Sequence, residues 1–179
     1  MSTWSSRGLR GSVLEDFVNK SNEQYREMGL ALIQKVPTPI TPIEFDKTNR
    51  HITLAYFEKK STVDYIGAVQ GIPVCFDAKE CSTNSFPMAN IHEHQIEFMK
   101  DFEKQRGIAF FLLYFIQEDL FYYLTLEEAL KFKERADNGG LKHFKTGELN
   151  ADFFLKRGRD VLVPYLDMIA KDLEQRSQK

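Results

Sequence analysis

The chain has 179 residues, enough for one domain with a hydrophobic core and too few for two domains of ordinary size. Its hydrophobic content of 42% and charged content of 28% are typical of a globular protein. The formal net charge of −2 gives no overall attraction for nucleic acid, so any DNA binding must come from local clusters of Lys and Arg or from cations at an acidic site.

Nothing in the composition points to secretion or to a membrane. The two cysteines are too few for a disulfide scaffold and favour a reducing compartment. Residues 1–10 lack the apolar segment of a signal peptide. The longest apolar run, residues 108–116, is far shorter than the roughly 20 residues of a membrane span and indicates a buried strand. We therefore expect a soluble, cytoplasmic protein.

The first part of the chain predicts a helix. Ser12 and Glu15 have the spacing of a capping box. Apolar residues at helical spacing then predict a helix from Val13 to about Gln34.

The next segment predicts a β-hairpin. Three prolines exclude a helix there and favour an extended chain: Pro37, Pro39 and Pro42. Strand-like runs at 43–45 and 51–57 flank a polar turn at 46–49.

The remainder predicts strands and helices that alternate along the chain. Strands are expected at residues 63–69, 73–80, 108–116 and 119–124. Helices are expected from an Asn90 cap to Gly107, from a Thr125 cap to Ala136, and from about Val161 to Gln175. Helices that flank a mixed sheet define the α/β class.

Two acids and a lysine lie on neighbouring predicted strands. Because side chains alternate along a strand, Asp77 and Lys79 share one face, opposite the apolar Phe76 and Ala78. The carboxylates of Asp64 and Asp77 could together hold a hard cation. Lys79 could stabilise the negative charge that develops on a phosphate. The pattern is typical of metal-dependent nucleases, although an acid and a lysine also pair in this way on ordinary solvated strands.

Several motifs occur in order over nearly the whole chain and together resemble the RecU family of Holliday junction resolvases. They are Arg10-Gly11-x-x-Leu14-Glu15, Pro37-Thr38-Pro39, Ala55-Tyr56-Phe57, Ser61-Thr62-Val63-Asp64-Tyr65-x-Gly67, Phe76-Asp77-Ala78-Lys79-Glu80, and Ser85-Phe86-Pro87 followed by His92-x-His94-Gln95. The resemblance implies a restriction-endonuclease-like α/β fold, with a mixed central sheet flanked by helices. It also implies a single nuclease domain over residues 1–179, with a flexible arm at 1–10 and a protruding β-hairpin stalk at 36–57.

The resemblance also assigns roles to individual residues. It implies metal binding by Thr62, Asp64, Asp77 and Gln95. It implies catalytic roles for Asp64, Asp77, Lys79 and Glu15, with Lys79 as the stabiliser of the transition state and Glu15 near the site. It implies DNA contacts by Arg10, Lys47 and Arg50. The implied cofactor is Mg²⁺, with Mn²⁺ as a substitute. Where the family usually has Glu, this chain has Asp77, which is one methylene shorter.

Two of these residues have an equally good structural interpretation. The carboxylate of Glu15 could bond back to the Ser12 amide as part of a capping box. Gln95 lies on the apolar stripe of its helix, so its amide needs a polar partner, which a metal or a backbone carbonyl would provide equally well.

The implied function is Mg²⁺-dependent cleavage of four-way DNA junctions by a homodimer, in recombination and repair. A recombinase and a branch-migration helicase are the implied protein partners, and the nucleoid is the implied place of action. Two alternatives stay open: a duplex or flap nuclease of the same fold, and a catalytically silent junction-binding accessory protein. The intact set of Asp64, Asp77 and Lys79 argues against a silent protein.

Overall fold

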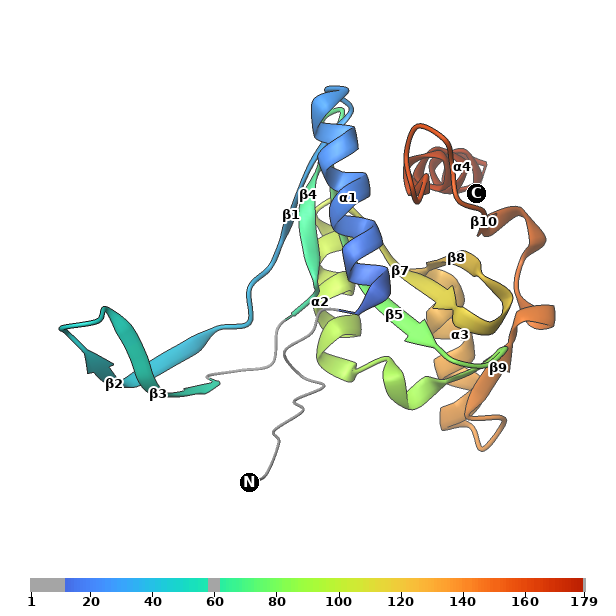
Figure 1. The fold of residues 1–179 in the computed structure, drawn as a ribbon. Coiled ribbons are helices and arrows are strands. Elements are labelled where there is room, and N and C mark those ends of the chain that lie inside the picture. Colours follow the sequence, from blue (N-terminus) through green and yellow to red (C-terminus); the bar gives the residue numbers. More distant parts are fainter. Residues whose placement is uncertain (1–11, 58–61, 179) are drawn as a thin grey trace.

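The computed structural model describes residues 12–57 and 62–178, which are built around a six-stranded sheet (Figure 1). The strand order across this sheet is β1 (Ala31–Lys35), β4 (Tyr65–Val69), β5 (Ile72–Cys81), β7 (Ile108–Phe115), β8 (Leu120–Thr125) and β10 (Phe154–Leu155). Strands β5 and β7 run parallel, and the other neighbours are antiparallel.

Helices cover both faces of the sheet. They are α1 (Val13–Glu27), α2 (Glu93–Lys104), α3 (Leu126–Asp137) and α4 (Tyr165–Ser177). Helices α1 and α4 lie on one face, where Tyr165 donates a hydrogen bond to Asn22 and Tyr123 donates one to Asp172. Helices α2 and α3 lie on the other face. Helix α2 contacts β5 and β7, and helix α3 contacts β7 and β8. The predicted α/β class with a mixed central sheet is confirmed.

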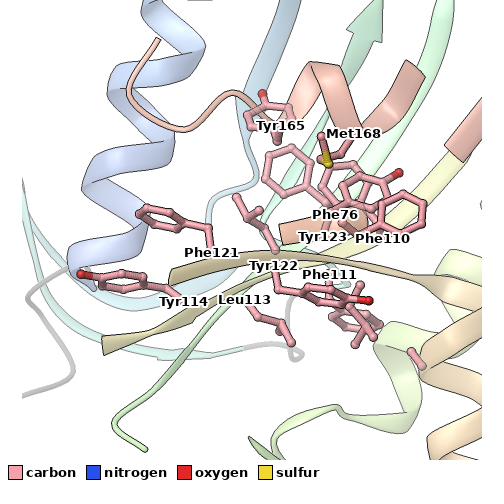
Figure 2. Packing of buried hydrophobic residues seen from close by; sticks show 14 of the residues in the cluster. Phe76, Phe110, Phe111, Leu113, Tyr114, Phe121, Tyr122, Tyr123, Tyr165 and Met168 are labelled. Atoms are coloured by element: carbon pink, nitrogen blue, oxygen red, sulfur yellow. The ribbon is translucent and has the colours of Figure 1, made fainter. Parts of the chain in front are cut away.

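The core follows from the continuous apolar strand β7, in which every residue is buried. Phe110 stacks between Phe76 of β5 and Tyr123 of β8, and Tyr165 of α4 closes this stack (Figure 2). Phe111 points to the opposite face of the sheet, as strand alternation requires. A strand buried on both faces must be apolar along its whole length, which is why residues 108–116 read as a strand from sequence.

The first predicted helix is too long. Helix α1 ends at Glu27, and residues 31–35 form strand β1 at the edge of the sheet. Gly29 adopts a positive φ of 68°, which turns the chain, and the Leu30 amide donates to the Tyr25 carbonyl to close the helix end. Pairing with β4 then overrides the helical pattern of these residues, and Leu32 is left exposed on the strand.

Other boundaries also differ from the sequence predictions. Helix α2 begins after His92 and not after Asn90, which lies in a short 3-10 helix, Met88–Asn90. Helix α4 begins only at Tyr165, because Pro164 occupies its N-cap. The sequence predictions missed a small second sheet of β6 (Ser85–Pro87) and β9 (His143–Lys145), strand β10, and the 3-10 helices Ile116–Glu118, Thr146–Glu148 and Ala151–Phe153.

The predicted hairpin is present and projects from the body of the molecule (Figure 1). Strands β2 (Ile40–Asp46) and β3 (His51–Phe57) form a two-stranded sheet separate from the main one. Its turn is ordered by Asp46, whose Oδ1 accepts hydrogen bonds from the amides of Thr48 and Asn49. Because β2 and β3 belong to a separate two-stranded sheet, the hairpin is not an edge of the main sheet.

Candidate functional site

Asp64 and Asp77 come together because β4 and β5 pair antiparallel. Tyr65 lies opposite Phe76, which places Asp64 beside Asp77 at the end of β4. Oδ2 of Asp64 accepts a hydrogen bond from the Ala78 amide at 3.0 Å, so this carboxylate satisfies a strand amide beyond the end of the ladder. The Asp64 carbonyl accepts from the Val36 amide at 2.8 Å, which ties the residue to the end of β1 as well.

Asp77 is a fully buried carboxylate, with 0% of its surface exposed. Burial, followed by repulsion from the neighbouring Asp64, raises the pKa of Asp77 from its usual value near 3.8 to about 7, against the lowering effect of Lys79. Two adjacent carboxylates, one of them buried, have more negative charge than a single lysine can balance. Strong perturbation of this kind is common at functional sites.

Lys79 is the cation of the site. Its Nζ lies 2.6 Å from Oδ2 of Asp77, and 18% of its side chain is exposed. The predicted shared face of Asp77 and Lys79 is therefore present. The ammonium group neutralises part of the buried charge and remains accessible from solvent.

Gln95 holds the other oxygen of Asp77. Its Nε2 donates to Oδ1 of Asp77 at 2.8 Å, and its Oε1 accepts from the His92 amide at 3.2 Å. The side chain is buried, as the apolar stripe of its helix predicted. Its polar partners are a carboxylate and a backbone amide, where the sequence had suggested a metal or a carbonyl.

Glu80 contributes a contact that the sequence did not predict. Its Oε1 accepts a hydrogen bond from the Leu14 amide at 2.6 Å, so the residue after Lys79 caps the N-terminus of α1. Strand alternation places Glu80 on the face opposite Lys79. Alternation could have indicated that face, but the sequence contained no sign that α1 would begin there.

Comparison with known proteins assigns the chain to a family. A family model described as "RecU: Recombination protein U" matches residues 9–171. The chain belongs to the RecU family. Proteins named Holliday junction resolvase RecU include relatives from Pediococcus pentosaceus, 38% identical over 93% of this chain and 86% of that protein, and from Geobacillus sp., 35% identical over 92% of this chain and 84% of that protein.

One solved structure also resembles this chain in part. It is that of Archaeoglobus fulgidus Hjc, a Holliday junction resolvase, with a TM-score of 0.40, 8% sequence identity, and coverage of 63% of this chain and 77% of that chain.

Two further residues expected from the RecU resemblance are Thr62 and Glu15. Thr62 is exposed and precedes Asp64 by two residues. Oε2 of Glu15 lies 2.5 Å from Nζ of Lys35, while Ser12 Oγ accepts from the Glu15 amide. The Ser12 cap is therefore present, and the Glu15 carboxylate pairs with β1.

The expected DNA-contacting residues of this RecU chain fall into two groups. Lys47 and Arg50 are exposed in the turn at the tip of the β2–β3 hairpin. Arg10 lies outside the residues that the structure describes.

The donor set fits a hard cation with few protein ligands. In residues 12–57 and 62–178, no three His, Cys, Asp or Glu side chains gather closely enough to hold a metal ion. The acid pair of Asp64 and Asp77 is compatible with Mg²⁺, which is commonly bound through one or two carboxylates and completes its shell with water and substrate phosphate.

Among residues 12–57 and 62–178, no helix has the length and apolar character of a membrane span.

Proposed function

We propose that this chain is a Mg²⁺-dependent, structure-selective endodeoxyribonuclease that resolves four-way DNA junctions. The observation that supports the proposal best is the cluster of Asp64, Asp77 and Lys79, which combines two adjacent carboxylates with an accessible ammonium group. Membership of the RecU family, whose relatives are named Holliday junction resolvases, supports the choice of substrate.

Asp64 and Asp77 would hold the cation, with Thr62 as a further oxygen donor and Mn²⁺ as a substitute for Mg²⁺. A divalent cation bound there supplies Lewis-acid polarisation of the scissile phosphate and a water of lowered pKa. Burial and Asp64 disfavour the charged form of Asp77. A divalent cation bound between the two carboxylates would offset this repulsion, and the site would therefore attract one.

Lys79 would stabilise the negative charge that develops on the non-bridging phosphate oxygens. Its Nζ is held against Asp77, so the charge is already oriented before substrate arrives. Preorganised charges of this kind are effective because no reorganisation is needed during the reaction.

The hairpin β2–β3 would provide the preference for junctions. It projects from the body, with Lys47 and Arg50 at its tip, and would enter the open centre of a four-way junction (Figure 1). Its exposed apolar side chains favour a homodimer in which a second copy covers them: Ile40, Ile43, Phe45, Ile52, Leu54 and Tyr56. A two-fold dimer also suits a substrate with near two-fold symmetry, in which two opposed strands are cut.

Recombination and repair would be the process served, in the cytoplasm at the nucleoid, with a recombinase and a branch-migration helicase as protein partners.

The proposal is tested by cleavage of an end-labelled four-way junction beside a duplex and a flap of matched sequence, each with Mg²⁺ or with EDTA. We expect paired nicks in the junction, little cleavage of the other substrates, and no cleavage in EDTA. Equal cleavage of duplex or flap would identify a general nuclease. Tight junction binding without cleavage under any divalent cation would identify a silent binding protein.

A further inference from the structure

The amide of Gln95 bridges the N-terminus of helix α2 and the buried Asp77. It is the third residue of α2, whose N-cap is His92, and it is 5% exposed. Its two ends make two different bonds: Oε1 accepts from the His92 amide at 3.2 Å and Nε2 donates to Oδ1 of Asp77 at 2.8 Å.

The orientation of this amide follows from its partners. A backbone N–H is only a donor, so the atom that faces His92 must be the oxygen of the side chain. Reversing the amide would place an NH₂ group against the His92 N–H and an oxygen against the Asp77 carboxylate. Both contacts would be lost in a buried environment where unpaired polar groups are costly.

The bonds also assign a separate task to each oxygen of Asp77. Oδ1 accepts from Gln95, and Oδ2 lies 2.6 Å from Nζ of Lys79. Oδ1 is therefore held by a hydrogen bond, whereas the contact of Oδ2 with Lys79 is an ion pair without hydrogen-bond geometry. The oxygen of Gln95, which is the atom that could bind a cation, is occupied by the start of α2 and faces away from Asp77.

We propose that Gln95 is a positioning residue, which orients the Asp77 carboxylate through its amide N–H, and that it does not itself bind the cation. The inference rests on the proposed function, because it concerns how a metal-holding acid is oriented. Partners that hydrogen-bond to metal-binding side chains commonly alter metal affinity about 10- to 100-fold when removed.

Gln95→Glu separates positioning from direct binding. A glutamate keeps an oxygen for the His92 amide, so the cap of α2 survives. It loses the donor to Asp77 and places an anion against it. We expect Mg²⁺ affinity, measured by calorimetry without DNA, to fall about tenfold or more. If the side-chain oxygen bound the cation directly, the anionic oxygen would preserve or tighten binding, and that result would overturn the proposal.

Gln24 offers a matched control. It also bridges two groups, on the other face of the sheet, but with a backbone carbonyl in place of the carboxylate: Oε1 accepts from the Leu162 amide at 3.1 Å and Nε2 donates to the Asp160 carbonyl at 2.7 Å. Gln24→Glu should leave Mg²⁺ affinity within twofold of the unmodified protein. An equal loss in both variants would mean that Gln95 acts only through general stability, which would also overturn the proposal.

Amide hydrogen exchange at His92 gives a readout that is independent of cleavage. If Gln95 keeps its bond to the His92 amide, the protection of that amide will be unchanged when Mg²⁺ is added. Loss of protection on adding Mg²⁺ would show that the side chain turns its oxygen to the cation, and the proposal would fail. An unmodified protein that binds no Mg²⁺ would instead overturn the proposed function, and the positioning role with it.

Discussion

Asp77 combines burial, an adjacent carboxylate and a lysine contact within one side chain. Its pKa near 7 in the folded protein lies above the usual value of 3.8, so the folded state holds its proton more tightly between these two pH values. The metal-free protein therefore has this contribution to stability in full below about pH 4, and loses it as pH rises through 7. A shift of this size corresponds to up to about 4 kcal/mol.

We expect the free energy of unfolding in EDTA to fall between about pH 4 and pH 7, and Mg²⁺ to restore it at the upper end of this range. Urea unfolding at each pH, with and without Mg²⁺, measures the effect. Asp77→Asn should flatten the pH dependence and remove the response to Mg²⁺. An Asp77→Asn protein with an unchanged pH profile would show that another group is responsible.

Lys79→Ala should lower single-turnover cleavage by about 10²- to 10³-fold, because it removes a preorganised positive charge from the transition state. Mg²⁺ affinity should change little, since the ammonium group does not bind the cation. Lys79→Arg should rescue only in part, because a planar guanidinium cannot place its charge where the compact ammonium group lies. Lys104→Ala, at an exposed lysine of α2 that pairs with the exposed Asp101, is the control. Unimpaired turnover in Lys79→Ala would contradict the role.

At the scale of elements, strand β5, which carries Asp77 and Lys79, is joined to helix α1 through Glu80. Its carboxylate satisfies one of the amides that a helix leaves unpaired at its N-terminus, and its negative charge lies at the positive end of the helix dipole. Lys79 and Glu80 thus give one strand two tasks on opposite faces of the sheet. Helix α1 is held at its start by Ser12 and Glu80 together.

Glu80→Ala should lower the free energy of unfolding by about 1 to 2 kcal/mol, the usual effect of losing an N-terminal cap. Glu80→Gln retains an acceptor and should lose less. Urea unfolding, combined with hydrogen exchange in the first turn of α1, measures both changes. Glu97→Ala, at an exposed glutamate of α2, is the control and should be close to neutral. Equal stability of Glu80→Ala and the unmodified protein would mean that the hydrogen bond contributes nothing.

At the scale of the whole molecule, the main sheet carries Asp77 and Lys79, and the hairpin lies apart from it (Figure 1). Replacing residues 44–53 by a short Gly-Ser turn should leave Mg²⁺ affinity unchanged, because the acid pair belongs to β4 and β5. It should reduce the preference for junctions over duplex. A shortened protein that prefers junctions to the original degree would place selectivity elsewhere.

The tip of the hairpin has its own test. Lys47→Ala combined with Arg50→Ala should weaken junction affinity and reduce the slope of log K against log salt concentration by about one unit per lost phosphate contact. Binding titrations at several salt concentrations measure this slope. Lys20→Ala, at an exposed lysine of α1, serves as the control. An unchanged slope in the double variant would exclude Lys47 and Arg50 as phosphate contacts.

Local sequence patterns were sufficient to predict much of the fold and the shared face of Asp77 and Lys79. A continuous apolar run identified β7, and alternation along β5 placed Asp77 and Lys79 on one face. Ser12 and Thr125 cap their helices as their spacing indicated. These features depend on residues within a few positions of one another, where backbone geometry determines which side chains are neighbours.

The remaining features depend on contacts between residues far apart in the chain. Residues 31–35 have a helical pattern, but pairing with β4 makes them a strand. The apolar residues of the hairpin do not by themselves determine whether it packs on the main sheet, and only the folded chain places it in a separate sheet. The bonds from Glu80 to Leu14 and from Gln95 to Asp77 span 66 and 18 residues. No local periodicity encodes such pairs, because the partner of a buried polar group is selected by the packing of whole elements against one another.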